Sequence, residues 1–107
     1  MSIETKTACF TVGELVHHQL FDYRGVVIDV DSEFSGSEEW YEKVARTRPP
    51  KDQPWYRVLV HKSEQQTYVA QRNLEAEPDP KPIEHPLVDL FFEDFKDGLY
   101  IPRSKTN

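Results

Sequence analysis

The sequence predicts a small all-β domain, and two well-separated segments carry that prediction. Residues 54–62 and 25–31 are rich in aromatic and β-branched residues and repeat with a period of two, as strands do. Each segment has one fully apolar face. In residues 54–62 this face consists of Tyr56, Val58 and Val60, and in residues 25–31 it consists of Val26, Ile28 and Val30. Because the opposite faces are mixed, we expect a sheet with one face on the core and one in water.

Length and composition set the class of protein. With 107 residues, 37% hydrophobic and 30% charged, the chain has the size of one domain with one core. It contains no apolar run near the roughly 20 residues that a membrane span requires. The first ten residues lack the pattern of a signal peptide. Because Cys9 is the single cysteine, a reducing compartment fits, and we expect a soluble cytoplasmic protein.

The first part of the chain predicts two strands joined by a turn. Residues 1–9 are expected to be a flexible N-terminus, and a first strand is expected within residues 10–19, where Gly13 permits a bend. Asp22 and Gly25 are typical turn residues and end that strand. The segment through Asp31 then forms the second strand.

A long excursion separates the two central strands. Residues 32–53 have no strand pattern, and the serines of residues 35–37 can cap a short helix over 38–46. Acidic residues begin this helix and basic residues end it, which the helix dipole favours. Pro49 stops it. A connection of this length in a small domain is usually functional or mobile.

The C-terminal part predicts a hairpin, a linker and a helix. Residues 63–66 form the turn and 67–70 the return strand, so that the small all-β domain would span 10–76. The proline-rich stretch up to Pro86 is expected to be an extended linker. Between Pro86 and Gly98 the spacing of apolar residues predicts an amphipathic helix. Residues 77–107 would thus hold the linker, the helix and a C-terminal tail.

Charge is distributed unevenly. The net charge is −6, which is unusual for a protein whose main function is to bind the phosphate groups of nucleic acids. Residues 43–62 nevertheless contain six basic residues and one acidic residue, a local balance of +5, whereas residues 29–42 contain acids and no base. A local anion-binding face therefore stays compatible with an acidic chain.

The basic stretch with interleaved aromatic residues is the candidate site for DNA or a partner protein. Cations and flat rings suit contact with phosphates and bases, or with a protein groove. The candidates are Trp40, Tyr41, Lys43, Arg46, Arg48, Lys51, Trp55 and Arg57. In the alternative interpretation the rings complete the core and the cations pair with nearby acids.

The apolar stripe of the predicted terminal helix is a second candidate surface. It comprises Leu87, Phe91, Phe92 and Phe95. These residues would cover the open end of the domain, contact a second copy of the chain, or less often serve a partner groove. A structural oligomer built on this stripe is one hypothesis for the protein.

No pattern for catalysis, a cofactor or a metal is found. His17 and His18 are adjacent in a predicted strand, so their rings point to opposite faces and cannot share an ion. The sequence contains no paired-cysteine metal motif, no nucleophile elbow and no glycine-rich phosphate loop. We therefore predict a non-enzymatic protein with no cofactor and no metal.

Several segments, in their order and spacing, resemble a known family. They are residues 10–13, 23–31, 48–56, 68–70, 85–86, 90–91 and 98–103. Together they resemble the hemimethylated-DNA-binding, YccV-like family, also described as the heat shock protein HspQ family. The resemblance implies an SH3-like five-stranded β-barrel with a long loop between its second and third strands and a short C-terminal helix.

The resemblance also implies two activities and no catalytic residues. One is an accessory role in stress-linked protein degradation, acting on an ATP-dependent protease or its substrates; the other is binding of hemimethylated duplex DNA, linked to control of a replication initiator. It further implies self-association, as a trimer for example. The acidic chain and its apolar terminal stripe favour the first activity. DNA binding through residues 43–62 is the alternative.

Overall fold

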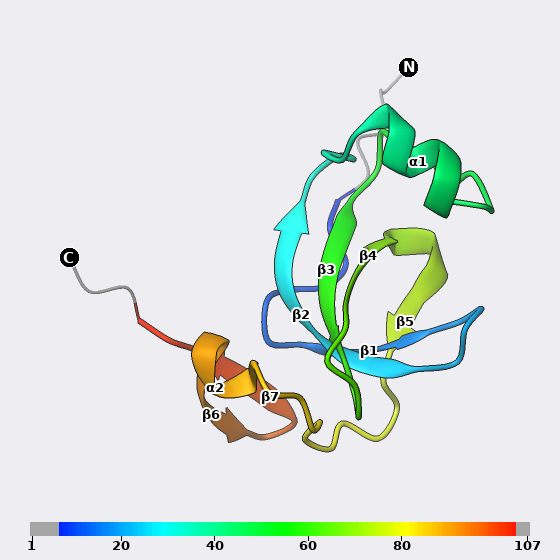
Figure 1. The fold of residues 1–107 in the computed structure, drawn as a ribbon. Coiled ribbons are helices and arrows are strands. Elements are labelled where there is room, and N and C mark those ends of the chain that lie inside the picture. Colours follow the sequence, from blue (N-terminus) through cyan, green and yellow to red (C-terminus); the bar gives the residue numbers. More distant parts are fainter. Residues whose placement is uncertain (1–6, 105–107) are drawn as a thin grey trace.

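The computed structural model describes residues 7–104 and confirms the all-β class. An antiparallel sheet has the strand order β4-β3-β2-β1-β5, with β3 and β2 near its centre and β4 and β5 at its edges (Figure 1). The strands are β1 (Leu15–His18), β2 (Arg24–Asp31), β3 (Trp55–Val60), β4 (Gln66–Ala70) and β5 (Leu74–Ala76). A single-turn 3-10 helix, η1 (Gln71–Asn73), joins the two edge strands.

The predicted helix in the long connection is present. Helix α1 (Glu38–Val44) begins after Ser37, whose side chain accepts a hydrogen bond from the N–H of Trp40 at 3.0 Å. This is the N-cap that the serines predicted, and the helix ends before the prolines as expected. No helix within residues 7–104 is long and apolar enough to cross a membrane.

A first core fills one face of the sheet. Tyr56 and Val58 of β3 lie at its centre and are fully buried. The other buried members come from β1, β2, β4, β5 and the N-terminal segment and are Phe10, Val16, Val27, Val69 and Leu74. The hydroxyl of Tyr56 accepts hydrogen bonds from the N–H groups of Cys9 and Phe10, at 3.0 and 3.3 Å. The N-terminal segment is thereby fixed across the core.

An irregularity in β2 changes the face that its last residues occupy. The sequence predicted that Val26, Ile28 and Val30 share one face, and this was wrong for Val30. The pairing with β3 shifts register between Val27 and Asp29, so that Val30 packs with Val27 against the first core. A bulge inserts one residue and inverts the alternation beyond it, which period-two reasoning does not detect.

The C-terminal segment contradicts the predicted helix. Helix α2 (Val88–Phe91) has four residues and is followed by two paired strands, β6 (Phe92–Lys96) and β7 (Leu99–Pro102). Asp97 and Gly98 connect the strands with positive φ angles of 52° and 80°. Asp-Gly is a strong signal for a two-residue hairpin turn, and here it outweighs the spacing of apolar residues that suggested a longer helix. Gly98 therefore forms a hairpin turn rather than a helix cap.

Both faces of the sheet are covered, so the expectation that one face lies in water is wrong. At one end, the β6–β7 hairpin packs on the second face (Figure 1). The buried residues there are Leu15, Val26, Leu59, Ile83, Phe92 and Tyr100. At the other end α1 packs over Trp55 and Ala70. Consecutive residues of β3 are buried on opposite faces for this reason.

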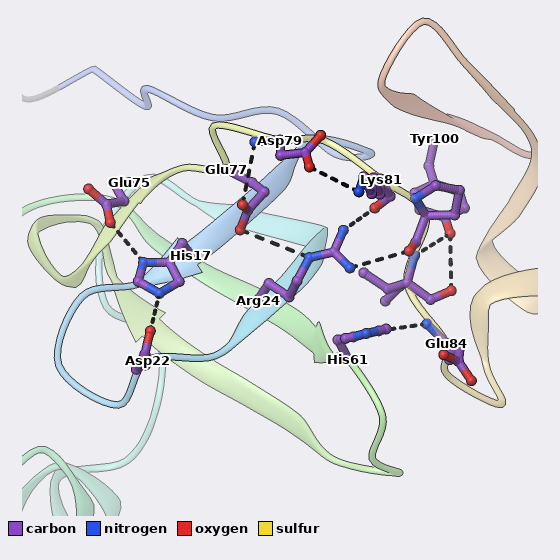
Figure 2. Close-up of polar contacts among 12 residues, drawn as sticks. His17, Asp22, Arg24, His61, Glu75, Glu77, Asp79, Lys81, Glu84 and Tyr100 are labelled. Atoms are coloured by element: carbon purple, nitrogen blue, oxygen red, sulfur yellow. Dashed lines mark hydrogen bonds and ion pairs between the residues drawn. The ribbon is translucent and has the colours of Figure 1, made fainter.

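The proline-rich linker is extended and tied to the sheet. The guanidinium of Arg24 on β2 donates hydrogen bonds to the carbonyls of Lys81 and Pro82 (Figure 2). His61 Nδ1 accepts the N–H of Glu84 at 2.9 Å, and the Tyr100 hydroxyl accepts the N–H of Ile83 at 2.9 Å. These contacts hold the linker against the sheet and thereby position the β6–β7 hairpin on the second face.

Candidate functional site: a groove beside the open edge of strand β4

The aromatic candidates form one cluster rather than a row of exposed rings. Trp55 is 1% exposed and Tyr41 is 8% exposed, and Trp40 is half-buried. Phe34 and Tyr68 complete the cluster, with the ring centres of Phe34 and Trp55 4.9 Å apart and those of Trp55 and Tyr68 5.2 Å apart. This cluster fastens α1 and the long connection to the sheet.

Two of the basic candidates pair with acids of α1. Arg48 lies 2.8 Å from Glu42, and Lys51 lies 2.6 Å from Glu38. The ammonium of Lys51 also lies 4.3 Å from the centre of the Tyr41 ring. Such exposed pairs add little stability, but they neutralise the cations locally. For these residues the structure agrees with the alternative interpretation, in which rings are core and cations pair with acids.

The remaining basic candidates keep more freedom. Lys43 and Arg46 are exposed and make no ion pair within residues 7–104. Arg57 lies over the ring of Tyr68 at 4.8 Å and is 3.7 Å from Asp29. Only part of the predicted basic face is therefore available to an anionic partner.

A carboxylate at the end of β2 fixes the start of the long connection. Asp31 accepts hydrogen bonds from the hydroxyls of Ser35 and Tyr68, each at 2.6 Å. These two bonds, the one from Ser35 first, hold the pKa of Asp31 below its ordinary value. The Tyr68 side chain of β4 is thus set in one orientation.

A groove of about 590 Å³ lies between α1, β4 and the turn that joins β1 to β2. Its lining brings together three candidates that are separated in sequence, namely Trp40, Arg46 and Arg57. Trp55 forms part of its wall. Tyr41, Lys43, Arg48 and Lys51 lie outside its lining. The second candidate surface, which includes Phe91 and Phe95, instead packs on the core under the hairpin.

The β1–β2 turn places two large apolar side chains at this groove. His18 is 4% exposed, and its Nδ1 accepts the N–H groups of Leu20 and Phe21 at 3.1 and 3.0 Å. The ring of Phe21 stacks on that of His18 with centres 4.6 Å apart. Leu20 and Phe21 are 53% and 73% exposed. Neither residue was predicted from the sequence, where the only signal was an apolar pair inside a turn.

His18 is held in its neutral form. Burial lowers the pKa of its imidazole, and the positive charge of the neighbouring His17 would lower it further. Since Nδ1 accepts two backbone hydrogen bonds, the proton of the neutral ring is on Nε2. Protonation of Nδ1 would remove both acceptor contacts, so the turn depends on the neutral ring.

His17 fixes the same turn from the opposite side of β1. Its ring nitrogens lie 2.6 Å from Asp22 Oδ1 and 2.7 Å from Glu75 Oε2, which joins the turn to β5 (Figure 2). The hydrogen bonds to Asp22 and then to Glu75 raise the pKa of His17. As predicted, the two adjacent histidines point to opposite sides.

Strand β4 has one free edge, and it borders the groove. Ladder hydrogen bonds of antiparallel strands alternate along the strand. The bonds from the Val60 N–H to the Gln65 carbonyl and from the Gln71 N–H to the Pro54 carbonyl fix their phase between β3 and β4. Gln66, Tyr68 and Ala70 therefore direct their N–H and C=O groups away from β3. The C=O of Ala70 begins the 3-10 helix η1, whereas the N–H groups of all three residues and the C=O groups of Gln66 and Tyr68 have no hydrogen-bond partner within residues 7–104. All of β4 contributes to the groove lining.

The charged side chains at the groove are of one sign. Arg46 and Arg57 line it together with the neutral His18, and no aspartate or glutamate of the described chain does. The site thus combines apolar rings, cations and an unpaired strand edge. It offers contacts for recognition along an extended surface.

The fold and this site define a small all-β domain with an open sheet edge. The family model for hemimethylated DNA-binding protein YccV-like domains matches residues 8–99, which includes all five strands of the sheet and most of the hairpin. The chain therefore belongs to the YccV-like family, as the resemblance in sequence indicated.

The two histidines predict opposite effects of pH on stability. The raised pKa of His17 adds stability below its ordinary value of 6.5, which is lost as pH rises through the raised value. The lowered pKa of His18 adds stability above 6.5, which is lost as pH falls. Urea denaturation of the wild type and His17→Gln should therefore show a difference in unfolding free energy that is largest below pH 6.5 and shrinks above it. A difference independent of pH would contradict the pairing with Asp22 and Glu75.

Proposed function

We propose that this protein is a non-enzymatic binding module that recognises partner proteins at the groove beside β4. The main observation in support is that three apolar residues line this one groove although each is more than half exposed. They are Leu20, Phe21 and Val44. Isolated exposed apolar residues are ordinary, but their concentration beside aromatic and arginine side chains is typical of a protein interface. The net charge of −6 also favours protein partners over a polyphosphate.

We further propose that the curved sheet is an SH3-like barrel. The order β4-β3-β2-β1-β5 and the single 3-10 turn between the edge strands support this assignment. So does the cover that α1 and the hairpin provide over the second face. In such a barrel the long connection and the β1–β2 turn flank a common surface, which is where the groove lies.

The biological role that fits a protein-binding groove is an accessory one in stress-linked protein degradation. The resemblance to heat shock proteins of this family supports it. The partner would be a cytoplasmic ATP-dependent protease or one of its substrates. The module would raise the local concentration of one partner at the other.

This role predicts that the chain changes the rate at which a protease degrades a substrate. A purified ATP-dependent protease from the source cell should degrade an unfolded test protein faster when the chain is added. Phe21→Ser should weaken the effective binding about tenfold, because exposed aromatic anchors dominate interface energies. Titration of the chain against the degradation rate measures both effects.

A matched control is available in helix α2, directly before the hairpin. Leu90 is 66% exposed and is not part of the groove lining, so Leu90→Ser removes a comparable apolar surface elsewhere. It should leave the titration unchanged. Equal losses in both variants, or no effect of the wild-type chain on any protease of that cell, would refute the proposed role.

The second candidate function is binding of hemimethylated duplex DNA. The description of the family favours it, and the unpaired cations Lys43 and Arg46 are the residues on which it would depend. Ion pairs at Arg48 and Lys51 leave few further charges for phosphate contacts. Binding of this kind would be weak and strongly dependent on salt.

Fluorescence anisotropy with three duplexes of one sequence tests this candidate. If it holds, the hemimethylated duplex binds more tightly than the fully methylated and unmethylated ones, and Arg46→Gln lowers the slope of log K against log salt by about 0.9. Lys96→Gln, which removes an exposed cation of β6 outside residues 43–62, serves as the matched control and should leave the affinities unchanged. Equal affinities for all three duplexes would exclude recognition of hemimethylation.

A further inference from the structure

We propose that β4 accepts an extended acidic peptide segment as an additional strand of the sheet. The inference rests on the proposed protein-binding function and names the chemistry of the partner at the same groove. It starts from the sheet edge, where Gln66, Tyr68 and Ala70 direct their backbone groups away from β3. An edge with free N–H and C=O groups is a template for another strand.

The dimensions of the site suit a short strand. The five residues of β4 extend over about 13 Å at the usual rise of a strand, enough to pair with a segment of four to six residues. The adjoining volume of about 590 Å³ has room for its side chains. Leu20 and Phe21 from the turn and Val44 from α1 supply apolar contacts along its borders.

The charge of the lining selects the partner. Side chains of a strand alternate between two sides, so an added strand can place apolar residues on one side and charged residues on the other. The ionised groups at the groove are the guanidiniums of Arg46, which has no ion pair among the described residues, and of Arg57, which lies 3.7 Å from Asp29. No carboxylate is among the described lining residues. Neutral His18 adds an Nε2–H donor. A segment that alternates apolar residues with aspartate or glutamate complements this site.

The backbone groups favour a peptide over a nucleic acid. The edge of β4 offers carbonyl acceptors as well as N–H donors, and a peptide backbone pairs with both. Phosphate groups accept hydrogen bonds but do not donate them at neutral pH, so they would leave the carbonyls of Gln66 and Tyr68 unpaired. The aliphatic Leu20 and Val44 add nothing to a phosphate contact.

An NMR titration of the ¹⁵N-labelled full chain tests the inference. The probe is an acetylated and amidated hexapeptide that alternates valine with aspartate. Formation of new hydrogen bonds should shift the amide protons of Gln66, Tyr68 and Ala70 downfield. The amides of Thr67 and Val69 already bond to β3 and should shift less. This alternation along β4 is a signature that ordinary surface binding does not produce.

Changes to the protein and to the peptide distinguish the contribution of the backbone edge of β4 from that of the charged side chains. Gln66→Pro removes an outward N–H without removing a ladder bond to β3, and it should weaken binding about tenfold, whereas Gln66→Ala keeps the N–H and should bind as the wild type does. Arg46→Glu should weaken binding to a similar degree. N-methylation of alternate residues of the probe should abolish binding in one register and spare it in the other, with no change to the protein.

Three results would overturn the inference. These are equal binding of a probe that alternates valine with lysine, binding of a hexathymidylate but not of the peptide, and uniform shifts along β4. Because these measurements use the purified chain without a protease, failure of the degradation assay would leave them unaffected. Conversely, an accelerated degradation that depends on Phe21 but not on the edge of β4 would retain the proposed function and reject strand addition.

Discussion

The structure depends on the burial of β3 on both of its faces. Trp55, Tyr56, Val58 and Leu59 are each at most 1% exposed, although they alternate between opposite sides of the sheet. A strand of this kind requires a cover on each side, because leaving one face in water would expose Trp55 and Leu59 together. The first core supplies one cover, and α1 and the β6–β7 hairpin divide the other between them.

This division of the second face explains where the molecule is open. The covering elements lie at opposite ends of the sheet (Figure 1), and neither pairs with β4. The turn between β1 and β2 projects Leu20 and Phe21 beside that unpaired edge, held there by His18 on one side and His17 on the other. Structural demands of the core thus leave the edge of β4 open, bordered by apolar and cationic side chains, and this is the surface that we propose for recognition.

Local patterns predicted most of the elements, whereas long-range contacts decided the rest. Strand β3, the Ser37-capped helix and the opposite orientation of His17 and His18 follow from spacing and capping alone. The bulge that redirects Val30 adds one residue without a sequence signal. In the C-terminal segment the apolar spacing and the Asp97–Gly98 turn conflicted, and the turn prevailed because pairing with β7 buries Phe92 and Tyr100.

The site was harder to predict than the fold. Arg48 and Lys51 were counted as part of a basic face, but the carboxylates that neutralise them lie on the helix folded beside them. Leu20, Phe21 and Tyr68 gained their importance only from the approach of the β1–β2 turn to β4. Net charge and composition carry no information about such approaches, since these depend on the tertiary fold.

The most direct test of two-sided burial is the contribution of the hairpin to stability. Phe92 is 2% exposed beneath the second face, whereas Leu90, two residues away, is 66% exposed. Urea denaturation of Phe92→Ala should show a loss of about 3–5 kcal/mol, against no more than about 0.5 kcal/mol for Leu90→Ala. Equal and small losses in the two variants would show that the hairpin is not part of the core. That result would contradict the burial of β3 on both of its faces.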